Sequence, residues 1–248
     1  MKGLDESAVL SARALLSRAR RVAVLTGAGI SAESGLPTFR GAGGLWDGFN
    51  SQELASPQGW AMDPAKVWRW HNRLRLALRR ARPNAAHRAL ARLQQRAAGW
   101  ESFRLATQNI DALHQRASST GVLELHGSLL RVQCNGCRTQ RDLDLYCDCD
   151  DPPTCSRCAW PMRPAVVWFG EQLPTAMWEA AFEAARSCDV LLSVGTSAAV
   201  YPVAGLIELA ARAGAKVIEV NLEPTPMTAT AELSLWGPAG RVLPRLLE

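Results

Sequence analysis

Two short polar clusters in the stretch 105–130 carry residue types that can do acid–base chemistry. Gln108, Asn109 and Asp111 form the first cluster, which follows a short apolar run, and His126 belongs to the second. Polar side chains at the carboxyl end of a strand face the ligand crevice of an open α/β sheet. An imidazole transfers protons near neutral pH, so His126 is the candidate catalytic histidine, with Asn109 and Asp111 as its partners. A purely structural histidine is the alternative.

A glycine motif near the N-terminus predicts a loop that binds a nucleotide pyrophosphate. Residues 22–26 are mostly apolar or β-branched, as in a buried parallel strand, and GAGISA at 27–32 matches G-x-G-x-x-G/A directly after them. Such glycines let backbone N–H groups approach phosphate oxygens. The glycine-rich continuation, 33–46, could fold over a cofactor with Arg40 facing phosphate and Phe39 covering a ring. A plain connecting loop is the alternative for this segment.

Six of the seven cysteines lie between residues 134 and 158, which favours a metal site over disulfides in a chain without an export signal. The two outer pairs form C-x2-C-x17-C-x2-C, the spacing of a structural zinc site that is closed by four thiolates. Cys147 and Cys149 form a C-x-C pair that could replace one outer pair, but a C-x2-C turn holds one metal more readily. The expected ligands are Cys134, Cys137, Cys155 and Cys158.

Composition indicates an ordinary soluble protein with a full hydrophobic core. The chain has 248 residues, of which 48% are hydrophobic and 21% charged. Its net charge is +5, but the arginines are scattered and form no basic block, so a nucleic acid is not an expected partner. Neither a signal peptide nor a membrane span is expected, and the cytoplasm is the expected location. The oligomeric state is left open.

Alternating helical and strand patterns predict a doubly wound parallel sheet, a Rossmann-like α/β fold. Helices are expected at residues 5–20, 85–97, 176–187 and 203–213, with a further helical stripe within 51–81. Strands are expected at residues 21–27, 103–106, 165–169, 189–194 and 216–220. The segments 40–82 and 127–164 interrupt this alternation, so a second, smaller lobe with helices and the zinc site is predicted.

These motifs together resemble the sirtuins, which are NAD-dependent protein deacylases, and the match covers nearly the whole chain. The motifs that carry the resemblance, besides the two cysteine pairs, are GAGISAESGLPTFRG at 27–41, TQNID at 107–111, ELHGS at 124–128, VWFGE at 167–171, GTSAAVYP at 195–202 and NLEPTP at 221–226. The resemblance implies one catalytic domain over 1–248. Its large lobe would comprise about 1–39, 83–126 and 165–248, and its small lobe about 40–82 and 127–164.

The resemblance also implies which residues bind NAD and an acyl-lysine peptide in the cleft between the lobes. The cofactor residues would be Gly27, Ala28, Gly29, Ser31, Phe39, Arg40, Trp46, Gln108, Asn109, Ile110, Asp111, Gly195, Thr196, Ser197, Asn221, Leu222, Glu223 and Ala239. The acyl-lysine path would be lined by Val167, Trp168, Phe169, Gly170 and Glu171.

In the implied reaction, the acyl oxygen of the substrate captures the ribose as nicotinamide leaves, so no strong protein nucleophile is needed. His126 would act as the base for a ribose hydroxyl, and Asp111 would hold the carboxamide of nicotinamide. Mono-ADP-ribosyl transfer would use the same cofactor residues and is the second candidate reaction. A non-catalytic module that binds NAD and zinc is a third, remote possibility.

The preferred acyl group is harder to predict. FRGAGG and VWFGE resemble the sirtuin branch that removes succinyl groups with a Tyr and an Arg three residues apart, but this chain has His71 and Leu74 at those positions. Arg73 or Arg75 could reach the same space, and a shifted alignment would pair Trp70 with Arg73. Deacetylation is therefore the first expectation and desuccinylation stays open, because a neutral acyl group needs no cationic partner.

Overall fold

The computed structural model describes residues 5–38, 44, 48–96, 99–147 and 149–247. The expectations for Phe39, Arg40 and Trp46 lie outside these described residues. Among the described residues, no helix combines the length and the apolar character that are needed to cross a bilayer.

Six parallel strands form the main sheet, in the order β3-β2-β1-β7-β8-β9. The strands are β1 (Arg21–Thr26), β2 (Ser102–Thr107), β3 (Leu123–Glu124), β7 (Val190–Val194), β8 (Lys216–Asn221) and β9 (Leu233–Trp236). The central strands are apolar on both faces, since β7 is buried along its whole length and β1 everywhere except Arg21. Burial on both faces requires a layer of helices on each side, and both layers are present.

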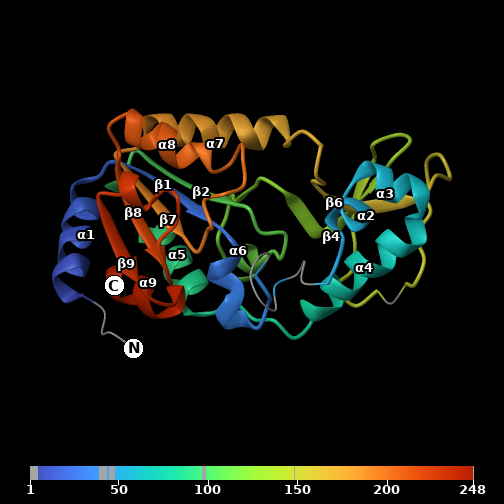
Figure 1. Ribbon diagram of the computed structural model, residues 1–248, viewed down its shortest axis with the longest axis horizontal. Helices are drawn as coiled ribbons and strands as arrows, with labels where there is room; N and C mark the ends of the chain where they lie inside the picture. Colours follow the sequence, from blue (N-terminus) through green and yellow to red (C-terminus); the bar gives the residue numbers. More distant parts are fainter. Residues whose placement is uncertain (1–4, 39–43, 45–47, 97–98, 148, 248) are drawn as a thin grey trace.

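Helices cover the two faces of this sheet, as Figure 1 shows. On one face α1 (Glu6–Arg18), α5 (Ala85–Arg96) and α9 (Ala239–Leu247) pack on side chains such as Val22 and Val24. On the other face α7 (Thr175–Ser187) and α8 (Gly205–Arg212) pack on the intervening residues, Ala23 and Leu25. This alternation along β1 is the period of a β-strand. The doubly wound parallel fold that the sequence predicts is therefore confirmed.

A second sheet of three antiparallel strands lies beside the first, in the order β5-β4-β6. Its strands are β4 (Gly127–Cys134), β5 (Gln140–Asp142) and β6 (Met162–Val166). Three helices lie with it at the same end of the molecule in Figure 1: α2 (Ser51–Leu54), α3 (Pro57–Met62) and α4 (Pro64–Ala77). Trp60, Trp68 and Val67 from these helices share an apolar core with Val132 of β4 and Met162 of β6.

One strand that was expected in the main sheet lies elsewhere. The strand expected at 165–169 is present only at residues 165 and 166, and its expected place in the main sheet was wrong, because β6 ends at Val166 and pairs antiparallel with β4. β6 is an edge strand of the second sheet, which is why Pro164, without an N–H group, can belong to it. β9 and α9, which complete one edge of the main sheet and one of its helical layers, were not predicted from the sequence.

Candidate active site

The strand order places a ligand crevice at the carboxyl ends of β1 and β7. The chain continues from β1 toward one edge of the sheet and from β7 toward the other, and such a switch point is where open α/β sheets bind ligands. The glycine motif follows β1 as η1, a 3-10 helix (Ala28–Ser34), and residues 195–197 follow β7. The backbones of these two loops touch, since Gly29 N donates to Gly195 O at 2.8 Å.

Glycine is required where these loops meet. A Cβ atom on Gly29 would lie 2.8 Å from Gly195 O, and one on Gly195 would lie 2.4 Å from Ile30 N. Gly195 also has a φ of +58°, which side-chain-bearing residues rarely adopt. The glycines thus keep the two loops in contact at the head of the crevice.

We predict that Gly195→Ala destabilises the chain more than Gly121→Ala does. Both glycines have a φ of +58°, but a Cβ on Gly121 meets nothing within 4 Å. Both variants lose about 1–2 kcal/mol to left-handed backbone strain, and Gly195→Ala loses roughly 1–3 kcal/mol more to the clash with Ile30. Urea unfolding of the two variants measures the difference. Equal losses would contradict the close packing of the two loops.

Amide side chains from the end of β2 connect the two loops. Gln108 Nε2 donates to Thr196 Oγ1 at 2.8 Å, and Asn109 Nδ2 donates to both Gly27 O and Ser31 Oγ at 3.1 Å. Asn109 Oδ1 is buried and has no hydrogen-bond partner among the described residues. A buried acceptor without a donor is costly, so this oxygen indicates the place of a ligand that donates a hydrogen bond.

Asp111 lies directly beside this amide cluster and is almost fully buried. Ser31 Oγ donates to its Oδ2 at 2.7 Å, and Leu113 N donates to its Oδ1 at 2.8 Å. Burial raises the pKa of Asp111, although both hydrogen bonds oppose that change by favouring the carboxylate. Ser31, Asn109 and Asp111 thus form one connected polar network under the glycine motif.

His126 lies in the turn between β3 and β4, where the main sheet meets the second sheet. Its Nδ1 donates to Gln108 O at 2.9 Å, which fixes the ring against the same polar cluster. Burial lowers the pKa of His126, and the bond to the Gln108 carbonyl opposes this. The next residue, Gly127, has a φ of +77°, and a Cβ there would lie 2.1 Å from Ala165 O. β6 therefore packs directly against the backbone that carries His126.

A buried network below the crevice supports it and was not identified from the sequence. Thr26 Oγ1 donates to Thr107 Oγ1 at 2.8 Å and lies 2.9 Å from His114 Nε2. Burial lowers the pKa of His114 to about 3, so this histidine is neutral and structural. Asn84 Nδ2 donates to Ile30 O at 2.7 Å and so supports the end of the glycine motif. The only sequence signal for Asn84 was its place before a helix.

The residues expected at the adenosine half of NAD follow β7 and β8. Asn221 Nδ2 donates to Thr196 O at 2.9 Å and thereby joins the two strand ends, and Asn221 Oδ1 accepts from Leu222 N at 2.9 Å. The Leu222 side chain is exposed, and so is that of Glu223. Ala239 begins α9 and its methyl group packs into the core.

The segment expected to line the acyl-lysine path, 167–171, follows β6. Val167 N donates to His126 O at 2.9 Å, which places the segment next to the candidate base. Trp168 is buried and its Nε1 donates to His71 Nε2 at 3.3 Å. Glu171 accepts two bonds from Arg163, at 2.6 and 2.7 Å, and one from Trp168 N at 2.9 Å. Glu171 therefore fixes the shape of this segment.

The four outer cysteines come together as a candidate zinc site in the second sheet. Their sulfur atoms all lie within 4.8 Å of one another. Cys134 and Cys158 Sγ are 3.3 Å apart, and Cys137 and Cys155 Sγ are 3.7 Å apart. A tetrahedral zinc with Zn–S bonds of about 2.3 Å requires S–S distances of roughly 3.8 Å, so the four thiols fit this metal. Cys147 and Cys149 are not part of this group of four, and their sulfur atoms lie 2.9 Å from each other.

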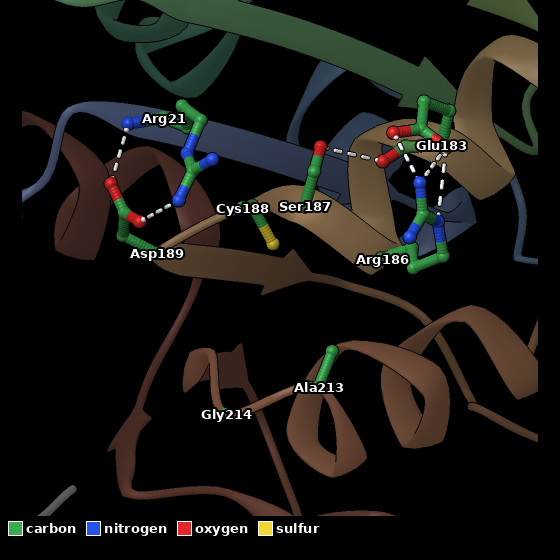
Figure 2. Close-up of a pocket in the computed structure, with 8 residues that line it drawn as sticks. All are labelled: Arg21, Glu183, Arg186, Ser187, Cys188, Asp189, Ala213 and Gly214. Carbon is green, nitrogen blue, oxygen red and sulfur yellow. Dashed lines mark hydrogen bonds and ion pairs between the residues drawn. The ribbon is translucent and has the colours of Figure 1, made fainter.

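The depression drawn in Figure 2 lies at the opposite end of the main sheet. It has a volume of about 550 Å³ and is lined by residues at the amino ends of β1, β7 and β8. Its charges are satisfied within the protein, because Arg21 pairs with Asp189 at 2.9 Å and Arg186 pairs with Glu183 at 2.8 Å. This depression therefore offers no unpaired group that resembles the polar cluster at the carboxyl ends.

Comparison with known proteins agrees with this geometry. The Sir2 family model matches residues 27–202, which include the glycine motif, His126 and all four zinc-site cysteines. The chain belongs to the Sir2 family. An NAD-dependent protein deacylase 2 of Pyrobaculum aerophilum is 49% identical over 94% of this chain and 92% of the relative. An NAD-dependent protein deacylase of Thermus thermophilus is 50% identical over 90% of this chain and 88% of the relative.

Solved Sir2 structures have the same fold as this chain. The crystal structure of a Sir2 homolog–NAD complex superposes with a TM-score of 0.88 at 39% identity, over 99% of this chain and 93% of the other. A Sir2–p53 peptide–NAD+ structure superposes with a TM-score of 0.82 at 33% identity, over 94% of both chains. The family assignment therefore holds for sequence and fold alike.

Proposed function

We propose that this chain is an NAD-dependent protein-lysine deacylase that releases nicotinamide, 2′-O-acyl-ADP-ribose and the unmodified lysine. The observation that carries this proposal is the His126 ring, whose Nδ1 is held by the Gln108 carbonyl while its Nε2 has no partner among the described residues. An imidazole held in this way is a base with one open nitrogen. The names of the relatives, NAD-dependent protein deacylases, support the same activity.

NAD fits the crevice at the carboxyl ends of β1 and β7. Glycines keep η1 and the loop after β7 close together, and the unpaired Asn109 Oδ1 is an acceptor for a donor group of the cofactor. When bound, NAD supplies a nicotinamide–ribose bond whose cleavage leaves positive charge that the acyl oxygen of the substrate can capture. The described residues proposed to hold it are Gly27, Ala28, Gly29, Ser31, Gln108, Asn109, Ile110, Asp111, Gly195, Thr196, Ser197, Asn221, Leu222, Glu223 and Ala239.

Each of the proposed catalytic residues has a role that its contacts allow. His126 Nε2 would accept the proton of a ribose hydroxyl of bound NAD and so activate this hydroxyl toward the acyl carbon of the substrate. Asp111 is held by Ser31 and Leu113 N and orients the carboxamide of nicotinamide. Asn109 donates to Gly27 O and Ser31 through Nδ2, which leaves Oδ1 directed to the ligand.

We propose that the acyl-lysine peptide enters between two lobes and passes the segment Val167, Trp168, Phe169, Gly170 and Glu171. The lobes would have the boundaries expected from the sequence, except that β6 takes residues up to 166 into the small lobe. The four clustered cysteines would hold one structural zinc there, because four thiolates leave no coordination position for a substrate. The Sir2–p53 peptide–NAD+ complex supports a peptide substrate.

Product analysis tests the activity. The purified chain is incubated with NAD and an acetyl-lysine peptide, and the products are separated and weighed by mass spectrometry. We expect free lysine peptide, nicotinamide and 2′-O-acetyl-ADP-ribose in equal amounts. A protein adduct of ADP-ribose without lysine release would indicate transferase activity instead, and no release of nicotinamide would indicate a binding module.

We also propose that the chain prefers neutral acyl groups, with acetyl as the first choice. His71 is buried, and because Nδ1 donates to Val67 O and Nε2 accepts from Trp168, it is neutral. Burial lowers the pKa of His71 to about 4. The nearby Arg163 is held by Glu171 and lies 3.5 Å from the centre of the Trp168 ring. These contacts support a path without a cation for an acidic acyl group.

The contacts of the two arginines considered from the sequence support the same preference. Arg75 is buried and donates to the carbonyls of Asp144 and Leu145, both at 2.7 Å, so it anchors the loop before Cys147. Arg73 is exposed on α4, whereas Trp70, its partner in the shifted alignment, is buried, so the two side chains do not share one environment. Leu74, at the position of the expected arginine, is half-buried against the apolar core of the second sheet.

We predict that kcat/KM for an acetyl-lysine peptide exceeds that for the matching succinyl-lysine peptide by at least about tenfold, or 1.4 kcal/mol. The carboxylate of a succinyl group would lose its water on entering this path without gaining a cationic partner, and this cost raises the activation barrier of the succinyl reaction. Leu74→Arg should narrow the ratio by improving the succinyl reaction, whereas Leu74→Met, which keeps the site apolar, should leave it unchanged. Equal rates for both peptides with the unmodified chain would refute the preference for neutral groups.

A further inference from the structure

The segment 64–100 has a charge composition unlike that of the rest of the chain. It contains nine arginines and one lysine but neither Asp nor Glu. The whole chain has 28 basic and 23 acidic residues, so the remaining residues, with 18 basic and 23 acidic, have a net charge of −5. The segment alone has a net charge of +10. This positive charge lies on α4, on α5 and on the turn between them.

The fold gathers five arginines at the turn that follows α4, and we name them the arginine patch: Arg79, Arg80, Arg82, Arg88 and Arg116. Arg80, Arg82 and Arg88 are exposed. The turn passes along the lower edge of Figure 1, between the two sheets, and Arg116 of α6 (Leu113–Arg116) reaches it from another part of the chain. Arg116 donates to the carbonyls of Leu78 and Ala81, at 3.1 and 2.8 Å.

Four of the five patch arginines, all except Arg80, are held in place by carbonyl groups. Arg82 donates to the carbonyls of Arg79 and Ala81 at 2.6 and 3.0 Å, and Arg79 donates to Leu145 O at 3.1 Å. Arg88 donates to Pro83 O. Such bonds orient a guanidinium group but leave its charge uncompensated.

No ion pair joins a patch arginine to a carboxylate within the described parts of the chain. Elsewhere ion pairs are common, as between Arg131 and Glu124, and between Arg245 and Glu6. Within 64–100, Lys66 has such a partner, Glu53 at 2.6 Å. Among the described residues, the fold thus concentrates positive charge at this turn without a carboxylate paired to it.

A stripe along α4 extends the patch. Arg69 and Arg73 are four residues apart and lie on one face of α4, and Arg80 lies in the turn that follows the helix. All three are exposed. From Arg69 to the end of the helix at Ala77, α4 is about 12 Å long at 1.5 Å per residue. Duplex DNA carries one negative charge per about 1.7 Å of its axis, so such a length of duplex presents roughly seven phosphates.

We propose that the arginine patch and the α4 stripe bind the phosphate backbone of a double-stranded nucleic acid, without reading its sequence. The guanidinium group forms two parallel bonds to a phosphate, and nine of the ten cations in 64–100 are arginines. A nucleic acid was not an expected partner because the arginines are scattered along the sequence, but the fold brings five of them together at this turn. A deacylase with this surface would act on proteins that are bound to the same nucleic acid.

The test measures binding of the full chain to a fluorescent 20-base-pair duplex at several salt concentrations. Arg69→Gln/Arg80→Gln removes two exposed arginines whose side chains form no hydrogen bond or ion pair with the described residues. Each phosphate contact adds about 0.9 to the salt slope, so the slope should fall by roughly 2. Arg18→Gln/Arg241→Gln is the matched control, because these two arginines are also exposed and their loss changes the net charge equally. The control slope should equal that of the unmodified chain.

Three results would overturn the proposal. One is an equal loss of binding in both variants, which would indicate an effect of net charge alone. Another is absence of duplex binding at low salt. The third is stronger binding to poly-glutamate than to the duplex, which would indicate an acidic protein partner. Deacylation of a free acetyl-lysine peptide should stay at the unmodified rate in both variants. This measurement separates the two proposals. If the unmodified chain and both variants all lack deacylase activity, the proposed function is refuted, but the proposal of duplex binding is not.

Discussion

His126→Ala is expected to reduce kcat for deacylation by about 10²–10⁴, the usual contribution of a general base. The reason is that Gln108 O fixes the His126 ring at 2.9 Å, which leaves its other nitrogen open to act as the base. An alanine side chain has no group that can accept a proton. NAD binding should be retained, because the glycine loops and the amide cluster do not depend on this ring. Single-turnover kinetics and the affinity for ADP-ribose measure these two properties separately.

An exchange assay controls for a general loss of structure in this variant. In the proposed mechanism His126 acts after nicotinamide has left, so exchange of labelled nicotinamide into NAD should persist in His126→Ala when acetyl-lysine peptide is present. Asp111→Ala should lose exchange, since Asp111 orients the departing group. If His126→Ala deacylates at the unmodified rate, His126 is not the base.

The pH profile gives a further check on the same residue. Burial lowers the pKa of His126, so the neutral form, which is the base, persists to lower pH than for an exposed histidine. The value of kcat/KM should therefore fall on the acidic side with a midpoint below about 6.5, the usual histidine pKa. The residual activity of His126→Ala should lack this fall. A midpoint at or above the usual value would contradict the role of His126 or its burial.

The sheet and the position of the crevice could be predicted because local patterns determine them. β1, β7 and β8 are short apolar runs that end in polar or small residues, and parallel strands bring all their carboxyl ends to one edge. The polar cluster at 108–111 could thus be assigned to this edge from its position after the predicted strand at 103–106, whereas no strand was predicted before His126. The glycine motif independently predicts a ligand site at the same edge, and the structure places Gly29 and Gly195 in contact there.

The hydrogen bonds of the site could not be predicted, because they join residues far apart in the sequence. Ser31 and Asp111 are 80 residues apart, and nothing in either local sequence specifies their bond. Asn84 was recognised as the start of a helix, where its side chain accepts from Ala86 N, but not as a support for Ile30. One side chain does both, and a local pattern reveals only the nearer partner.

Two other features show where apolar patterns are ambiguous. The run from Ala165 to Phe169 resembles a buried strand, but Trp168 is buried against His71 and Arg163 instead of in the main sheet. α9 contains Pro244, which normally argues against a helix. It forms because Val242, Leu243 and Leu246 enter the core together. In both places packing outweighs the local preference.

Cys155→Ser is expected to abolish stoichiometric zinc binding and to unfold the second sheet. Cys134 and Cys155 are buried in the same apolar core as Val132 and Met162, so an incomplete metal site leaves that core unsupported. Structural zinc contributes about 10–16 kcal/mol of binding free energy in small zinc-dependent folds, and losing one of four thiolates forfeits much of it. Zinc content by atomic absorption and a melting curve measure the loss.

The loss should reach the active site, because β4 runs from Gly127, the residue after His126, to the zinc ligand Cys134. Melting of β4 and β6 removes the Val167 N to His126 O bond, so deacylation should fall even though NAD still binds the main sheet. Cys147→Ser/Cys149→Ser is the matched control. These two sulfurs contact each other and lie outside the cluster of four, so this variant should keep one zinc per chain. Retention of zinc by Cys155→Ser, or its loss from the control, would place the metal on other ligands.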